Sequence, residues 1–262
     1  MGEHSNGRRA IALIPNGITV AALVLGMSAV VPASRGSSAT AVVLIVLAAV
    51  LDGLDGFAAR RLNAVSELGA QLDSLSDAVV FGAVPAVVLF GAALDTVGGW
   101  ALMLAYLVCV VFRLARFNLH LARPGPDGYE TRLVGVPAPL GAIIALTPIA
   151  ISEQWGQGWW LSHWFVGSCV VGAAALMASR LPTLSLKNLS VPWLNAVVVV
   201  CILAIALVLI AGVRYLFFAY VVFVGMYLLH IPLASRGLRR RNGAGRAVAR
   251  RTRSLVSRSP NR

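Results

Sequence analysis

Eight apolar stretches, each about long enough to cross a bilayer as a helix, make up most of this chain. Of its 262 residues, 58% are hydrophobic and only 12% carry a charge, far outside the range of soluble globular proteins. A helix needs about 20 apolar residues to cross the hydrocarbon core, and the alternation typical of membrane strands is not seen. The sequence therefore predicts an all-α, polytopic membrane protein. The expected helices are about 16–33, 38–60, 70–94, 99–121, 134–152, 162–179, 194–213 and 215–233.

The basic residues are distributed unevenly over the expected loops. With eight spans and a cytosolic N-terminus, 20 of the 22 basic residues fall on the cytosolic side, and only Arg35 and Arg214 do not. Because cytosolic loops are enriched in Arg and Lys, we expect both termini on the cytosolic side of the cell membrane. Arg8 and Arg9 precede an apolar stretch, as in a signal peptide. A retained first span is favoured, since Pro15-Asn16-Gly17 interrupts the apolar run.

The C-terminal end differs in composition from the rest. Residues 1–235 form the expected transmembrane domain, whereas 236–262 hold ten Arg and no acidic residue. This tail is expected to be disordered and cytosolic; a more specific alternative is that it binds anionic lipid head groups. Nucleic-acid binding is not favoured, because no recognisable module accompanies the charge. Cys109, Cys169 and Cys201 lie in expected spans without a CxxC pair and are interpreted as packing residues.

Four aspartates lie inside this apolar sequence, where ionised carboxylates are costly and usually mark a functional site. Asp52 and Asp55 are three residues apart, and Asp73 and Asp77 are four apart, so each pair shares one face of a helix. The segment between the pairs is expected to form a turn, with Ser66 as the N-cap of the second helix. At about 1.5 Å per residue, Asp55 and Asp73 both lie about 10 Å from this turn. We therefore expect the two pairs to face each other in a helical hairpin.

Four carboxylates so placed would repel one another strongly without a cation. Their oxygens suit Mg²⁺ or Mn²⁺ better than zinc, because no His or Cys lies among them. Four acids in one cluster could hold two divalent ions. Pairing with a neighbouring Arg, or helix capping, would account for one or two aspartates but not for four at helical spacing. Arg60, next to the cluster, is expected either to pair with an aspartate or to hold a phosphate.

The spacing of these residues resembles the signature of the CDP-alcohol phosphotransferases, over residues from about 12 to 235. The resemblance implies that the first three aspartates bind two divalent cations, Mg²⁺ or Mn²⁺, and that Asp77 completes the metal site and acts as the general base. The matching pattern is Asp52-x-x-Asp55-Gly56-x-x-Ala59-Arg60-x8-Gly69-x3-Asp73-x3-Asp77. Pro15-Asn16-x-x-Thr19 resembles the family's segment that lines the nucleotide site. The residues thereby expected at the nucleotide and diphosphate are Asn16, Thr19, Asp52, Gly56, Ala59, Arg60 and Gly69.

Two downstream segments concern the acceptor alcohol. Residues 112–118 and 135–139 resemble segments of membrane-embedded phosphatidylserine synthases. That resemblance implies a homodimeric enzyme that transfers the phosphatidyl group of CDP-diacylglycerol to the hydroxyl of L-serine and releases CMP. Arg113, Arg116 and Asn118 are then the expected acceptor-binding residues, since Arg binds carboxylates bidentately. Alternatively, the arginines only flank a span, and 135–139 only begins a helix.

Other functions stay open at this point. Within the same family, the acceptor could be glycerol phosphate or inositol phosphate. An Asp-rich intramembrane prenyltransferase normally has its two motifs farther apart than the 18 residues between Asp55 and Asp73. A cation transporter would not need Gly56 or Arg60, and no repeats are evident. Release of CMP separates an enzyme from a transporter, and dependence on serine separates the subfamilies.

Overall fold

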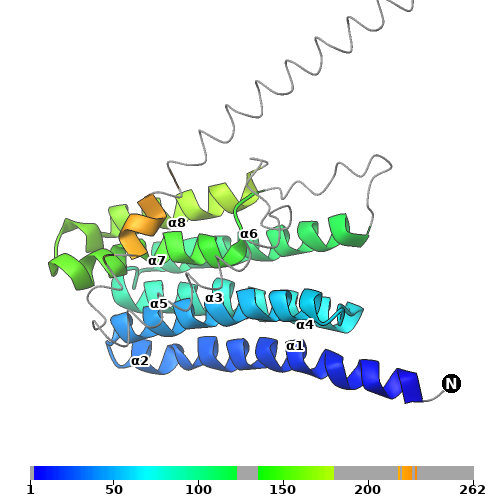
Figure 1. The fold of residues 1–262 in the computed structure, drawn as a ribbon. Helices are drawn as coiled ribbons and strands as arrows, with labels where there is room; N and C mark the ends of the chain where they lie inside the picture. The colour runs from blue at the N-terminus through cyan, green and yellow to red at the C-terminus, as the bar shows by residue number, and fades with distance from the viewer. Residues whose placement is uncertain (1–2, 123–134, 180–217, 219, 226–227, 229–262) are drawn as a thin grey trace, which may run out of the picture.

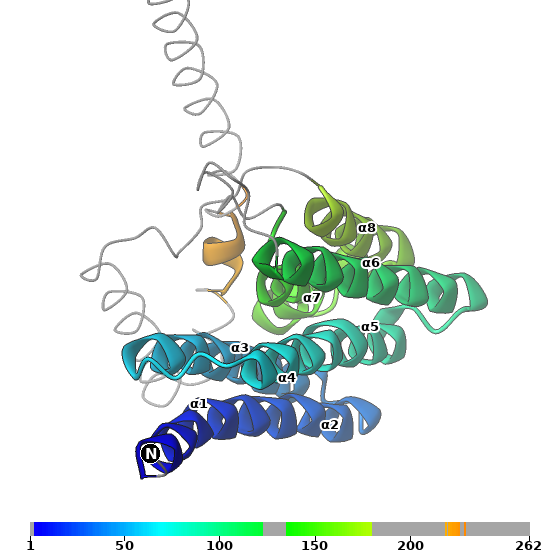
Figure 2. The same ribbon diagram turned by 90° about the vertical axis from the view of Figure 1, so that its right-hand side faces the viewer.

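The described part of the chain is a bundle of long helices (Figure 1). The computed structural model describes residues 3–122, 135–179, 218, 220–225 and 228, and every regular element in these ranges is helical, as predicted. In both views α1 and α2 form one layer, α3 to α5 a second, and α6 to α8 a third (Figures 1 and 2). The elements are α1 (Glu3–Ser28), α2 (Val30–Ser34), α3 (Ser38–Arg61), α4 (Glu67–Asp77), the π-helix η1 (Ala78–Ala83), α5 (Val84–Ala93), α6 (Val97–Ala122), α7 (Ala138–Trp155), the short 3₁₀ helix η2 (Trp159–Leu161) and α8 (His163–Ala178).

Four helical segments in the described ranges are long and apolar enough to cross a membrane. They are Leu13–Ser34, Ser38–Arg61, Glu67–Ala93 and Val97–Leu119. Their bounds agree within a few residues with the first four predicted spans. The prediction of a polytopic helical membrane protein is therefore confirmed.

The predicted number of eight spans is not confirmed. Helices α7 and α8 occupy the fifth and sixth predicted stretches, but neither is among the four qualifying segments. α8 has 16 residues, about 24 Å at about 1.5 Å per residue, which is less than the hydrocarbon thickness of about 30 Å. α7 ends in the polar run Ser152-Glu153-Gln154. The seventh predicted span, the tail 236–262 and most of the eighth span lie outside the described residues.

The turn between α3 and α4 is fixed at one end by backbone hydrogen bonds and at the other by a side-chain cap. α3 ends at Arg61, Asn63 just beyond it has a left-handed φ of 50°, and Ala64 N donates to Ala59 O at 2.9 Å. This is the six-to-one bond of a Schellman motif, and Asn tolerates the left-handed conformation better than most residues. α4 then begins at Ser66, whose Oγ accepts from Gly69 N at 3.1 Å, which confirms the predicted N-cap. The two motifs define how α4 returns alongside α3.

A π-helical segment, η1, follows Asp77 directly within the third span. π-Helical turns are rare and concentrate at functional sites. The Tyr106 hydroxyl of α6 donates to Phe81 O at 2.8 Å, deep in the core. On the opposite side, a Cβ on Gly26 of α1 would come within 2.6 Å of a valine side chain of η1. Contacts from α1 and α6 therefore hold the backbone just beyond Asp77.

Aromatic and basic side chains gather at opposite ends of the bundle. Arg60 and Arg61 lie in the last turn of α3, and Arg113 and Arg116 lie in the C-terminal half of α6, toward the end of the bundle where α4 begins. Tryptophans are enriched at membrane–water interfaces, so their position marks the other boundary of the bundle. The tryptophans of the described residues lie where α6 and α8 begin and α7 ends: Trp100, Trp155, Trp159, Trp160 and Trp164.

Candidate metal centre

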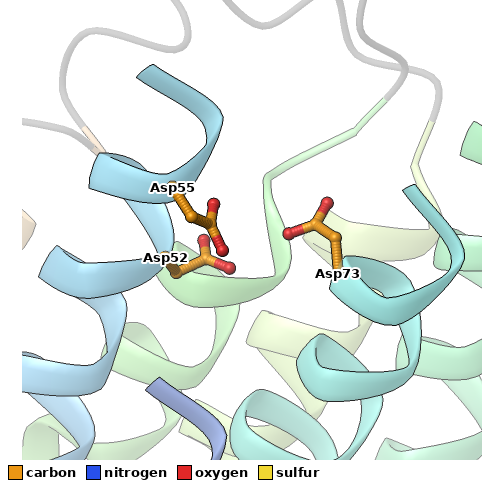
Figure 3. A group of neighbouring side chains, drawn as sticks. All are labelled: Asp52, Asp55 and Asp73. Carbon is orange, nitrogen blue, oxygen red and sulfur yellow. The ribbon is translucent and has the colours of Figure 1, made fainter. Parts of the chain in front are cut away.

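Three aspartates from two helices converge at one point of the bundle. Asp52 and Asp55 project from α3 and Asp73 projects from α4, with their carboxylates turned toward one another (Figure 3). One oxygen from each carboxylate lies within 4.8 Å of the others. Asp55 is buried, while Asp52 and Asp73 are half-buried. The structure thus brings the two helices together as an opposed pair, as the spacing predicts.

The fourth aspartate lies beside this group rather than in it. Asp77 is one turn beyond Asp73 on α4, at the junction with η1, and only 8% of it is exposed. Its carboxyl group is within hydrogen-bonding reach of Asp52. Its Oδ1 atom is buried and has no hydrogen-bond partner among the described residues. A buried carboxylate oxygen without a donor calls for a cation or a proton.

The residues present fit a divalent cation. The three carboxylates of Asp52, Asp55 and Asp73 could hold a metal ion, with oxygen ligands only. Oxygens on opposite sides of one Mg²⁺ are about 4.2 Å apart, at about 2.1 Å from the ion, so a spacing within 4.8 Å needs little side-chain movement. The oxygen without a partner on Asp77 adds a further acceptor at the edge of the group.

Arg60 lies over the α3 backbone beside the aspartates. A Cβ built on Gly56 would be 3.4 Å from Arg60 Nη1, so the guanidinium covers the backbone at Gly56. From there it attracts the Asp55 carboxylate electrostatically. Ala59 is half-buried on the same helix. The Arg60 side chain is exposed, so a phosphate group can reach it.

Asn16 and Thr19 contact the acid-bearing helices directly. The Thr19 hydroxyl lies 2.5 Å from Asp55 Oδ2, and Thr19 is buried. The Asn16 carboxamide lies against the first turn of α4, because a Cβ on Gly69 would be 2.9 Å from Asn16 Oδ1. Both residues come from α1, which packs on α3 and on α4. Sequence reasoning placed both residues at the nucleotide and did not foresee these contacts.

The three residues expected to bind the acceptor lie on α6 in different surroundings. Arg113 is buried, lies close enough to Asp77 to attract it, and has its guanidinium carbon 5.8 Å from the centre of the Phe117 ring. Arg116 Nη1 donates to Ala178 O at 3.2 Å, at the end of α8. Asn118 Oδ1 accepts from Ser74 Oγ at 3.1 Å. Arg113 is thus placed where its charge acts on the aspartate cluster.

The segment 135–139 begins α7 and packs on the end of α8. Gly135 has a φ of 87°, and a Cβ there would lie 2.5 Å from Met177 O. Val136 N donates to Leu176 O at 3.3 Å. The helix then begins at Ala138, after Pro137. The helix-start interpretation of this segment is therefore confirmed, and glycine is required by both the backbone angle and the close approach.

Ser74 is a residue of this centre that the sequence analysis missed. It follows Asp73 on α4 and links that helix to α6 through its bond to Asn118. Its hydroxyl also lies 3.1 Å from a second acceptor, Ala70 O, within its own helix. The only local signal was that five of the seven residues 71–77 are polar, which is unusual for a membrane span. Its partner Asn118 lies 44 positions away, and helical periodicity does not predict a contact at that separation.

Comparison with known proteins identifies relatives over the part of the chain that contains the aspartates. The family model described as CDP-alcohol phosphatidyltransferase matches residues 12–171. CDP-diacylglycerol–serine O-phosphatidyltransferase of Mycobacterium leprae is 43% identical over 166 residues, 62% of this chain and 55% of the relative. The protein of that name from Mycobacterium tuberculosis H37Rv is 44% identical over 160 residues, 60% and 56% of the two chains. That from Bacillus subtilis is 33% identical over 132 residues, 50% and 71%. The match thus spans little more than half the length of the two mycobacterial relatives.

The contact between Asn16 and Gly69 predicts opposite effects for two Gly→Ala substitutions. Gly69→Ala is expected to lower the free energy of unfolding by about 1–3 kcal/mol, since the new methyl group would meet Asn16 Oδ1 at 2.9 Å and Ser66 Oγ at 3.0 Å. Gly53→Ala, on α3 beside Asp52, meets nothing within 4 Å and should raise it by up to about 1 kcal/mol through helix propensity. Unfolding of both purified variants in detergent measures the difference, and equal stabilisation by the two would contradict the packing described.

Proposed function

The chain belongs to the CDP-alcohol phosphatidyltransferase family, and from this premise we propose that it transfers the phosphatidyl group of CDP-diacylglycerol to the hydroxyl of L-serine, with release of CMP. The observation that carries the proposal is the opposed group of Asp52, Asp55 and Asp73 between α3 and α4. The names of the relatives, which are serine O-phosphatidyltransferases, support the choice of acceptor.

Asp52, Asp55 and Asp73 would hold two divalent cations, Mg²⁺ or Mn²⁺, with Asp77 completing the site. When bound, the cations would supply positive charge against the diphosphate of the substrate and the departing CMP, and positioning with electrostatics carries most of phosphoryl transfer. The Arg60 guanidinium, exposed beside Asp55, would hold a phosphate oxygen from the other side. Gly56, Ala59 and Gly69 would border the nucleotide.

Asp77 would act as the general base. It is buried beside the other three aspartates, and its Oδ1 has no donor among the described residues, so this oxygen is available to a proton. In the proposed step the serine hydroxyl gives its proton to Asp77 as its oxygen attacks the phosphorus, and the bond from phosphorus to the CMP oxygen breaks. General bases typically contribute about 10²- to 10⁴-fold to a rate.

Serine's carboxylate would be bound by Arg113. Arg113 is buried and close enough to Asp77 for its charge to attract the proposed base. Arg116 and Asn118, by contrast, already hold Ala178 and Ser74. These two residues would act indirectly, by fixing the position of α6 relative to α8 and α4 and thereby the shape of the acceptor site. Guanidinium groups bind carboxylates in a defined orientation, so Arg113 would select an acceptor that carries one.

The site would open toward the cytosol. The aspartates lie about 10 Å from the turn that joins α3 and α4, at about 1.5 Å per residue, and this end of the bundle carries the arginines of α3 and α6. The positive-inside rule assigns that end to the cytosolic side of the cell membrane. The acyl chains of CDP-diacylglycerol could then stay in the lipid while the nucleotide meets water. Homodimer formation stays a prediction from the family resemblance.

The acceptor is tested by incubating the purified protein with CDP-diacylglycerol, Mn²⁺ or Mg²⁺ and one candidate alcohol at a time. CMP is expected with L-serine and not with glycerol phosphate or inositol phosphate, because of the three acceptors only serine has a carboxylate that Arg113 can bind. Phosphatidylserine in the lipid extract should match the CMP released. Formation of CMP with either phosphorylated acceptor, and not with serine, would refute the proposed substrate.

The role of Asp77 is tested by Asp77→Asn, which keeps the size of the side chain but cannot take the proton. Turnover should fall by at least about 100-fold, while the unfolding temperature in detergent stays near that of the wild type. Asp95→Asn is the matched control, since Asp95 is exposed at the far end of the bundle, 3.7 Å from His163, and should keep its activity. Normal turnover by Asp77→Asn would remove the assignment of this residue as base.

A further inference from the structure

Helix α1 contacts both helices that carry the aspartates. Asn16 and Thr19 are three residues apart on α1 and therefore share one of its faces. That face packs on α3 through Thr19 and on α4 through Asn16. Pro15, immediately before them, is buried within the same helix. One face of α1 therefore contacts both α3 and α4, the two helices whose carboxylates face each other.

Thr19 is bound to a carboxylate of the candidate metal centre. Only 4% of Thr19 is exposed, and its Oγ1 lies 2.5 Å from Asp55 Oδ2 and 3.1 Å from Pro15 O. A hydroxyl has one proton to donate, and an ionised carboxylate is the stronger acceptor of the two. The bond therefore ties one oxygen of Asp55 to α1 and leaves the other oxygen for the cluster.

Asn16 packs closely against α4. Its Oδ1 lies 2.9 Å from the position that a Gly69 Cβ would take, so the carboxamide can lie against α4 only because residue 69 is glycine. Gly69 is in the first turn of α4, one helical turn before Asp73. A shift of Asn16 would change the distance between α1 and α4, and with it the position of Asp73 relative to Asp55.

We propose that Asn16 and Thr19 are positioning residues that set the Asp55 carboxylate against Asp73, and that Thr19 does not contact the nucleotide. The proposal rests on the proposed function only in taking the aspartates as ligands of a divalent cation. The near-complete burial of Thr19 and the engagement of its hydroxyl carry it. A nucleotide could reach that hydroxyl only after the bond to Asp55 had broken.

The expected consequence is a change in metal affinity. A ligand carboxylate that is held by an outer hydrogen bond does not have to be ordered when the ion binds. Loss of such an outer partner typically weakens metal binding by about 10- to 100-fold. A residue that only contacted the nucleotide would leave metal binding in the absence of substrate unchanged, so the two roles predict different measurements.

The test is a titration of purified protein with Mn²⁺ in detergent, without CDP-diacylglycerol or serine, in which the free ion is followed by electron paramagnetic resonance. Thr19→Val has nearly the same shape but no hydroxyl, and should bind Mn²⁺ about 10- to 100-fold more weakly. Thr19→Ser keeps the hydroxyl and should bind within a few-fold of the wild type. Thr147→Val is the matched control: it removes a hydroxyl that bonds Ile143 O within α7, and should bind as the wild type does.

The outcomes separate this proposal from the proposed function. If the wild type binds Mn²⁺ and Thr19→Val binds it equally well but loses affinity for CMP, Thr19 is a nucleotide contact and the proposal is overturned. If the wild type itself binds no Mn²⁺, the metal site of the proposed function fails. Unfolding temperatures in EDTA show whether Thr19→Val is folded. Should it not fold, Thr19→Cys, whose thiol is a weak donor, replaces it, and binding equal to that of Thr19→Ser would overturn the proposal.

Discussion

Repulsion between the carboxylates of α3 and α4 is the constraint on which the rest of this structure depends. Two like charges about 4 Å apart repel by about 4 kcal/mol at an effective dielectric constant of about 20, and here three carboxylates have oxygens within 4.8 Å of one another. The surrounding fold nevertheless holds them at this separation. The Schellman turn at Asn63 and the Ser66 cap set the hairpin, η1 holds the backbone beyond Asp77, and α1 packs on both helices. A bundle that keeps this arrangement in apolar surroundings is organised to receive positive charge.

Two arginines extend this electrostatic design beyond the aspartates. Arg60 lies on the α3 side and attracts Asp55, whereas Arg113 lies on α6 and attracts Asp77. Arg60 is exposed and Arg113 is buried, so an anionic group arriving from water meets Arg60 first. In the proposed function, the diphosphate of the donor would lie at Arg60 and the carboxylate of the small zwitterionic acceptor at Arg113. The acyl chains of the donor would stay in the lipid, since the cluster lies within membrane-spanning helices.

The sequence was sufficient to predict what depends on local periodicity. The first four spans, the Ser66 cap and the opposition of the aspartate pairs follow from helical spacing and capping chemistry, and the structure contains each of them. Three other features depend on packing between distant segments, which cannot be predicted from the local pattern of a single sequence. They are the π-helix after Asp77, the bond from Thr19 to Asp55 and the bond from Ser74 to Asn118. The predicted count of eight spans is not confirmed, partly because apolarity alone does not separate a spanning helix from a shorter apolar one such as α8.

The central claim is that Asp52, Asp55 and Asp73 form one cation site between α3 and α4. Crystals of the protein soaked in Mn²⁺ and measured near the manganese absorption edge test it most directly, because anomalous scattering locates the ion independently of the protein atoms. The account predicts anomalous peaks for the bound ions at these three carboxylates, at the bonding distances of oxygen ligands. Anomalous peaks only elsewhere in the bundle, or none at Mn²⁺ concentrations that saturate binding in solution, would contradict it.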